Sequence, residues 1–317
     1  MSTPLRGTKS KLSLHLCGSV RGGYEVIGRR KNMSFLPTLP STGFFKEILA
    51  HVPPDESAAG VIGSAVSVAR LFAAHIDAVA AVEHSDWSYG SPDAAASGLE
   101  TIAAFENTVG AAARSLLQFE TAAQEAGLSY GKRLIADSTY SVDQMLVGAS
   151  RLYDVCVSAQ PEPAIASDAP LKAMLFDSGR PIILIPRAHR GGITLDHVAI
   201  CWDGGRYAAR ALHDAMPLLE RAGCIDIIAV NEPGECTAPS SEALASRLAR
   251  RRLNVRVRQP KSNQLNIHRA IMAVAAEAGS TLLVMGGYGH SKAGRFVLGG
   301  MTRNAVLEMT IPTFMSF

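Results

Sequence analysis

The residues best suited to ligand chemistry lie in a glycine-rich stretch near the C-terminus, GGYGHSKAGRFVLGG, over residues 286–300. Its glycines form two clusters, one where the chain leaves an apolar run and one, at Gly299 and Gly300, where it should enter a helix. Glycine lets backbone N–H groups approach an anion, and a helix N-terminus adds a favourable dipole. The pattern therefore indicates a phosphate cradle, although a loop whose turns need positive φ explains the same glycines. Nearby side chains that could add hydrogen-bond donors are His290, Ser291 and Thr302.

Two other positions suit the ligand sites of open parallel α/β sheets, in which ligands bind beyond the carboxyl ends of the strands. Asp203 follows a strand-like run and precedes Gly204 and Gly205, so its carboxylate could accept a hydrogen bond from a ribose hydroxyl. The same aspartate could instead cap the helix that follows. Val230 ends a second strand-like run, where its main chain could meet a base edge. The glycine-rich stretch matches neither G-x-G-x-x-G nor G-x-x-x-x-G-K-[ST], so no common nucleotide signature decides between these alternatives.

No constellation for catalysis or metal binding stands out in the sequence. The histidines are scattered, and no carboxylate or nucleophile lies at a spacing that demands a triad or a metal site. The five cysteines are odd in number and lack C-x-x-C spacing, which suggests neither a disulfide framework nor a zinc site. We therefore predict no catalytic residue, no metal ligand and a reducing, cytoplasmic setting. Lys172, Arg180 and Arg187 flank one predicted strand and are expected to form a solvated rim.

Composition predicts a folded chain with a weakly acidic body and a basic N-terminal segment. Apolar residues make up 47% and charged residues 19%, which excludes disorder of the whole chain. The net charge is +3, but residues 1–32 carry seven Lys or Arg against one Glu, so the remainder is acidic. Such a body gives no electrostatic footprint for nucleic acid, and no apolar window is long enough for a membrane-spanning helix.

The N-terminal segment itself, residues 1–43, is expected to be a disordered basic extension. Residues 1–32 could also lie upstream of a natural start at Met33, or form a targeting segment. Their best apolar patch, LSLHLCGSV, is short and contains a histidine, which makes a poor signal peptide.

Strand-like and helix-like segments alternate along the chain, which predicts the α/β class with parallel sheets and right-handed crossovers. Apolar runs typical of buried strands lie at residues 45–52, 76–83, 130–137, 153–160 and 181–186, and again at 197–203, 224–232, 254–260, 281–287 and 311–317. Helical segments separate them, the last expected from residue 297 to 309. The repeated element order indicates two domains, at residues 44–187 and 195–317, each an open, parallel five-stranded sheet flanked by helices, Rossmann-like in type.

The second unit resembles the universal stress protein family over residues 195–317. The phosphate-binding signature of that family is G-x-x-G, nine residues, and then Gly followed by Ser, Thr or Asn. Here Gly286 and Gly289 begin the signature, HSKAGRFVL supplies the nine residues, and Gly299 completes the spacing. Gly300 departs from the pattern, because it stands where the family has a hydroxyl or amide side chain. The nearest hydroxyl is two residues on, at Thr302.

This resemblance implies a tandem universal stress protein, with a fold similar to that of the adenine-nucleotide alpha hydrolases. It implies a stress-response regulator that binds ATP, with or without Mg²⁺, in its C-terminal domain. The resemblance places Asp203 on the ribose and the main chain of Val230 near the base. The residues it places around the phosphates are Gly286, Gly289, His290, Ser291, Gly299, Gly300 and Thr302.

The first unit looks like a degenerate copy of the second. Asp55 follows its first strand, but Pro161 and Pro163, which lack N–H donors, stand where the glycine signature would be. The pairing usual in the family, through the last strand, implies an intramolecular pseudo-dimer of the two halves, and leaves a homodimer of two chains open. Because no acid, base or nucleophile is identified, at most slow hydrolysis is expected. The alternative is a dimerisation or protein-interaction module of the same fold that binds no nucleotide, favoured by Gly300 and the degenerate first half.

Overall fold

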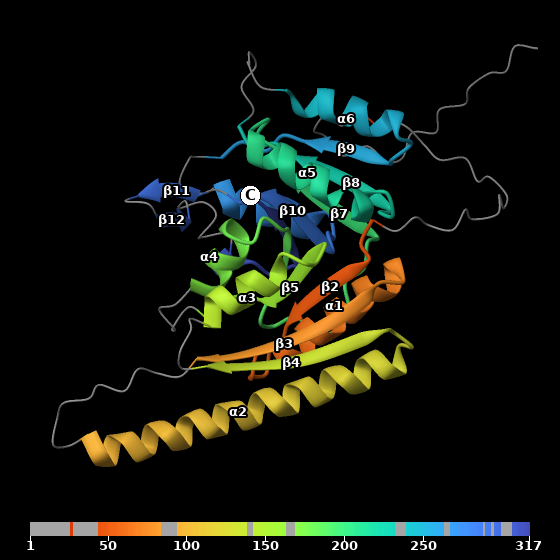
Figure 1. Ribbon diagram of the computed structural model, residues 1–317. Helices are drawn as coiled ribbons and strands as arrows, with labels where there is room; N and C mark the ends of the chain where they lie inside the picture. The colour runs from red at the N-terminus through yellow and green to blue at the C-terminus, as the bar shows by residue number, and fades with distance from the viewer. Residues whose placement is uncertain are drawn as a thin grey trace, which may run out of the picture.

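The ten predicted strands are all present in the computed structural model (Figure 1). The structure describes residues 26–27, 44–83, 94–137, 142–162, 169–231, 239–262, 267–287, 289–292, 295–298 and 306–317. In the first half the elements are β2 (Glu47–His51), α1 (Ala58–Phe72), β3 (His75–Glu83), α2 (Ala94–Glu125), β4 (Tyr130–Asp137), α3 (Val142–Ser150), β5 (Val155–Ala159), α4 (Ala169–Phe176) and β6 (Ile182–Ile185).

The second half repeats this order of elements. They are β7 (His197–Cys201), α5 (Arg206–Leu219), β8 (Cys224–Ile228), α6 (Ser241–Arg250), β9 (Val255–Arg258), α7 (Ile267–Glu277), β10 (Leu282–Gly286) and β13 (Thr313–Ser316). Three further strands were not predicted: β1 (Val26–Ile27), β11 (Gly289–Lys292) and β12 (Arg295–Leu298). Of the N-terminal extension the structure describes only β1, which pairs antiparallel with β9, so the predicted disorder of residues 1–43 otherwise lies outside the described residues.

The two halves share one sheet because their closing strands pair. Within the halves the strands are parallel and run in the orders β4-β3-β2-β5-β6 and β9-β8-β7-β10-β13. β6 and β13 pair antiparallel, with Phe314 opposite Ile183, so the two five-stranded units form a continuous sheet that β1 extends to eleven strands. The α/β class and the pairing through the last strand are confirmed, and the tandem halves form an intramolecular pseudo-dimer.

Helices cover both faces of the sheet, and the strands between them are buried on both sides. In β6, Ile183 and Ile185 belong to the core shared with α1, α2, α5 and α6, whereas Ile182 and Leu184 face the core formed with α3, α4 and α7. This alternation explains why the sequence of β6 is apolar at every position. α2 is 32 residues long and extends past the end of β4 (Figure 1). Among the described residues, no helix combines the length and apolar character needed to cross a bilayer.

The region of the glycine signature differs from its prediction. A helix was expected over residues 297–309, but residues 295–298 form β12 and only residues 306–308 are helical among those described. β12 pairs antiparallel with β11, Gly289 lying opposite Leu298. The sequence RFVL carries an aromatic and a β-branched residue, which favour a strand, and this preference prevails over the helix expected at residues 297 and 298.

Candidate functional site

The carboxyl ends of three strands in the second half bring the predicted residues to one edge of the sheet. β7 lies between β8 and β10, and the strand order reverses between β7 and β10. In an open α/β sheet this reversal marks the ligand crevice. Cys201 pairs with Ile228 and Ile200 with Val284, so the chain leaves the three strands at neighbouring points. The topology therefore places Asp203, Val230 and Gly286 at adjacent strand ends.

Asp203 lies in a tight turn between β7 and α5. Gly204 has φ +72°, which glycine adopts without strain, and the N–H of Gly205 donates to Asp203 Oδ1 at 2.8 Å. Gly205 is the N-cap residue of α5 and the helix has no side-chain cap, so Asp203 supports the turn before the helix and does not cap it. The side chain is exposed, and a carboxylate can accept several hydrogen bonds. The geometry therefore leaves Asp203 able to accept a ribose hydroxyl as well.

The end of β8 is fixed by Asn231. This residue has φ 54°, and its side chain hydrogen-bonds to the loop after β9. Asn231 Oδ1 accepts the N–H of Ser262 at 2.9 Å, and Asn231 Nδ2 donates to the carbonyl of Ser262. The N–H of Asn231 donates to Pro260 O at 3.2 Å. Within the described residues no backbone hydrogen bond engages Val230. A base edge could therefore contact the main chain of Val230, whose position is fixed by its neighbour Asn231.

Gly286 and Gly287, at the start of the glycine-rich stretch, pack closely against two helices. A Cβ on Gly286 would lie 2.6 Å from the carbonyl carbon of Tyr207, at the start of α5. A Cβ on Gly287 would lie 3.0 Å from Leu175 of α4, and the Gly287 N–H already donates to Ser316 O at 2.7 Å. Close packing therefore explains why glycine occupies these two positions, and neither a phosphate contact nor a positive φ explains it. They let a helix from each half approach the end of β10.

The remaining signature residues are only partly placed. Gly289, His290 and Ser291 lie in β11, which together with β12 forms the hairpin that α4 contacts from the first half (Figure 1). Three further predicted residues, Gly299, Gly300 and Thr302, lie outside the described residues. The edge of the second half is thus bordered by an element of the first.

Arg206 places a positive charge beside this edge, and the sequence analysis had not identified it as a site residue. The guanidinium of Arg206 lies 4.5 Å from the ring centroid of Tyr207, and Tyr207 stacks on Phe317 with centroids 4.9 Å apart. Phe317 in turn meets Phe176 of α4 edge-on at 4.7 Å. The sequence feature that could have indicated Arg206 is its position directly after Asp203, Gly204 and Gly205, as the first residue of α5.

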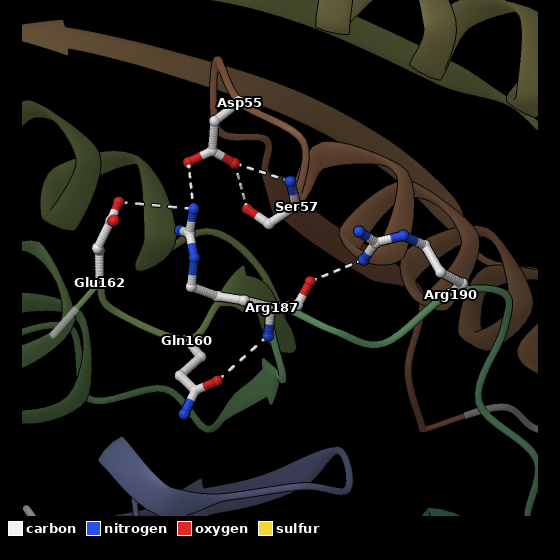
Figure 2. A network of polar contacts seen from close by, with 6 residues as sticks. All are labelled: Asp55, Ser57, Gln160, Glu162, Arg187 and Arg190. Atoms are coloured by element: carbon white, nitrogen blue, oxygen red, sulfur yellow. Dashed lines mark hydrogen bonds and ion pairs between the residues drawn. The ribbon is translucent and has the colours of Figure 1, made fainter.

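The first half places Asp55 where the second places Asp203, but its surroundings differ (Figure 2). Asp55 Oδ1 accepts the N–H of Ser57 at 2.8 Å, which repeats the Asp203 turn, and also the Ser57 hydroxyl at 2.5 Å. Arg187 Nη2 lies 3.1 Å from Asp55 Oδ2 and 3.5 Å from Glu162 Oε2. Burial raises the pKa of Asp55, but the Ser57 hydrogen bonds and the Arg187 charge together leave it below its ordinary value.

Arg187 is therefore no solvated rim residue, and that interpretation was wrong for it. Its side chain is 23% exposed and lies between Asp55 and Glu162, so the guanidinium occupies the carboxyl edge of the first half. The Arg187 carbonyl accepts from Arg190 Nη1 at 2.7 Å, which ties the start of the linker to the same network (Figure 2). Its position two residues after β6 did not indicate this role, because its ion-pair partners come from two other loops.

Two cysteines of the sheet, Cys201 at the carboxyl end of β7 and Cys156 near the amino end of β5, are not activated nucleophiles. Burial, and after it the charge of Asp203, raises the pKa of the Cys201 thiol to about 12, so the thiol stays protonated at neutral pH. Burial likewise raises the pKa of Cys156 to about 12. Within the part of the chain that the structure describes, no group of three His, Cys, Asp or Glu residues could hold a metal ion.

Comparison with known proteins identifies the architecture. No family model and no curated protein matches the sequence. The fold defines a tandem, Rossmann-like α/β protein with a strand-order reversal in its second half. Among solved structures, a universal stress protein from Archaeoglobus fulgidus DSM 4304 matches with a TM-score of 0.64 and 18% identity, over 87% of this chain and 98% of that one. A functionally unknown protein from Pseudomonas aeruginosa PAO1 matches with a TM-score of 0.52 and 13% identity, over 86% and 92%. The chain thus has the universal stress protein fold in both halves.

Proposed function

We propose that this chain is a tandem universal stress protein, a cytoplasmic stress-response regulator that binds ATP at the carboxyl edge of its second half. The observation that supports the proposal is that Asp203, Val230 and Gly286 follow or end neighbouring strands at the strand-order reversal of a universal stress protein fold. The exposed Asp203 would accept the ribose hydroxyls, and the main chain at Val230 would meet the adenine.

The phosphates would lie along the signature. Gly289 and Gly299 would give close backbone approach, with Gly300, His290, Ser291 and Thr302 around them. Gly286 would act indirectly, by letting α5 and its Arg206 approach the end of β10. Mg²⁺ keeps most of its water and binds largely through phosphate oxygens, so any Mg²⁺ would arrive with the nucleotide.

We further propose one nucleotide per chain. In the first half Arg187 already satisfies Asp55, and Pro161 lies at the exit of β5, where it offers no N–H. Because Cys201 is held as a neutral thiol, the second edge lacks an activated nucleophile of that type. Regulatory binding with at most slow hydrolysis is the chemistry that these residues support.

The matched pair Asp203 and Asp55 tests this proposal, because both accept the N–H of the residue two positions on at 2.8 Å. Titration calorimetry with ATP and Mg²⁺ should give one site for the wild type. Asp203→Ala should weaken binding about tenfold, the worth of a hydrogen bond to a charged group, whereas Asp55→Ala should leave affinity unchanged.

Gly289→Val should abolish binding with an unchanged circular dichroism spectrum, since a β-branched residue suits a strand.

Two results would contradict the proposal: no heat at millimolar nucleotide, or equal losses in the two aspartate variants. The first would favour the alternative, a protein-interaction module without nucleotide, for which Gly300 in place of a hydroxyl or amide residue is the supporting observation. Mass spectrometry of the denatured, freshly purified protein gives independent evidence, because a retained adenine nucleotide would exclude that alternative.

A further inference from the structure

A groove of about 490 Å³ lies between the two halves, along α5 of the second half. Its second-half wall comes from α5 and from the last turn of α6, whose residues Leu212 and Leu248 belong to one core. Its first-half wall includes Phe45, Asp154 and Pro181, which lie just before β2, β5 and β6. A space of this volume at a junction between domains has the size of a small-molecule site.

The groove is elongated and partly apolar, because it follows one side of α5. Ala209, Leu212, Met216 and Glu220 recur at spacings of three and four residues, so they line a single face of the helix. A helix rises about 16 Å between the first and the last of these positions. Leu212 is 4% exposed, whereas Phe44, which also lines the groove, is 71% exposed. An extended apolar chain lying here would shield Phe44 from water.

The three acidic side chains of the groove already accept hydrogen bonds from the protein. Asp154 Oδ2 accepts two backbone N–H groups, at 2.6 and 3.1 Å. Asp214 Oδ2 accepts from Arg210 Nε at 2.7 Å, and Glu220 Oε1 accepts from Arg251 Nη1 at 2.7 Å. A cationic ligand would have to compete with these donors, so the acids do not favour a cation in the groove.

The arginines of the groove, in contrast, have donors to spare. A guanidinium has five N–H donors, and Arg180 uses its Nε and Nη2 on the carbonyl of Arg151, at 3.2 and 3.0 Å. Within the described part of the chain, no hydrogen bond or ion pair engages the side chain of Arg247. It lies one helical turn before Arg251, on the same face. The four arginines outnumber the three acids, so the groove carries a net positive charge.

We propose that this groove binds a small amphipathic anion, an extended apolar chain that ends in a carboxylate. The chain would lie along α5, and the carboxylate would accept from Arg247 and from the remaining N–H groups of Arg251. Both halves line the groove, so neither half forms the site alone. This site is separate from the proposed nucleotide site and does not depend on nucleotide binding.

Titration calorimetry of the full chain with decanoate tests the proposal, with decylamine as a cation of equal chain length. Decanoate should bind at one site per chain, and decylamine at least about tenfold more weakly, because only the anion meets the unused donors. Arg247→Met should weaken decanoate binding about tenfold, the worth of a hydrogen bond between charged groups. Arg250→Met is the matched control, because Arg250 is exposed on the same helix but does not line the groove. It removes the same charge and should keep wild-type affinity.

Ala209→Trp tests the shape of the groove without changing its charge. Ala209 is exposed on α5 and lines the groove, so an indole should fill the space and abolish decanoate binding with an unchanged circular dichroism spectrum. Equal decanoate affinity in the Arg247→Met and Arg250→Met variants, or undiminished binding in Ala209→Trp, would overturn the assignment of the site. Decylamine binding as tight as that of decanoate would overturn the anion. A wild type that binds no decanoate but forms a dimer that Ala209→Trp disrupts would overturn the proposal in favour of a second copy of the chain.

Discussion

At the scale of single residues, Asp55 and Asp203 show how one local turn can serve two purposes. Both carboxylates accept the N–H of the residue two positions later at 2.8 Å. Both residues are exposed, and in the first half Arg187 reaches the other carboxylate oxygen of Asp55, at 3.1 Å. A sequence comparison of the two turns finds the aspartates, but only the fold brings Arg187 to one of them.

His51 makes stability depend on pH in a predictable direction. Burial lowers the pKa of His51 to about 4, while its Nδ1 lies 3.0 Å from the Ser158 hydroxyl. The unfolded chain binds a proton near pH 6.5 and the folded chain only near pH 4, so stability falls as pH decreases through this window. The free energy of unfolding can be measured by chemical denaturation at pH 7 and at pH 4. Between these pH values it should fall by about 2 kcal/mol less in His51→Asn than in the wild type. Ser158→Ala should keep the wild-type slope, because burial causes the shift; a flattened slope in that control would refute this account.

Elements were easier to predict than contacts. Strands such as β6 and β10 are buried on both faces, so their sequences are apolar throughout and visible without any structure. The hairpin of β11 and β12 was missed because neither GHSK nor RFVL is long enough for period-2 alternation to stand out. The packing role of Gly286 could not be predicted from the sequence either, since its neighbour Tyr207 lies on a helix much earlier in the chain.

Gly286 should therefore matter for stability before it matters for ligand binding. A valine at this position would bring its Cβ to 2.6 Å from the Tyr207 backbone, which cannot move without shifting α5. We expect Gly286→Val to cost about 3 kcal/mol or more in the free energy of unfolding, measured by urea denaturation. Gly148, inside α3, has nothing within 4 Å of an added Cβ, so Gly148→Ala should raise stability by about 0.5 kcal/mol. A stable Gly286→Val protein that had lost only ATP affinity would show that the glycine serves the phosphate instead.

At the scale of the whole molecule, the two halves share both of their hydrophobic cores. The core with α1 and α5 contains Ile183 from the first half and Phe314 from the second, and the opposite core contains Leu184 and Met315. The Arg221 guanidinium of the second half also lies 4.2 Å from the ring centroid of Phe72 in the first. We therefore expect the two halves, which repeat one order of elements, to unfold as a single cooperative unit.

This shared core predicts that a defect far from the junction destabilises both halves. Leu146 lies on α3 of the first half, is 1% exposed, and should cost about 3 kcal/mol when cut to alanine. If unfolding is cooperative, the slowest-exchanging amides of β7, β8 and β10 should exchange about a hundredfold faster in Leu146→Ala, as should those of β2 and β5. Exchange measured by mass spectrometry on both halves checks this, with calorimetry expected to show a single transition. Faster exchange confined to the first half would mean that β6 and β13 join two domains that unfold separately.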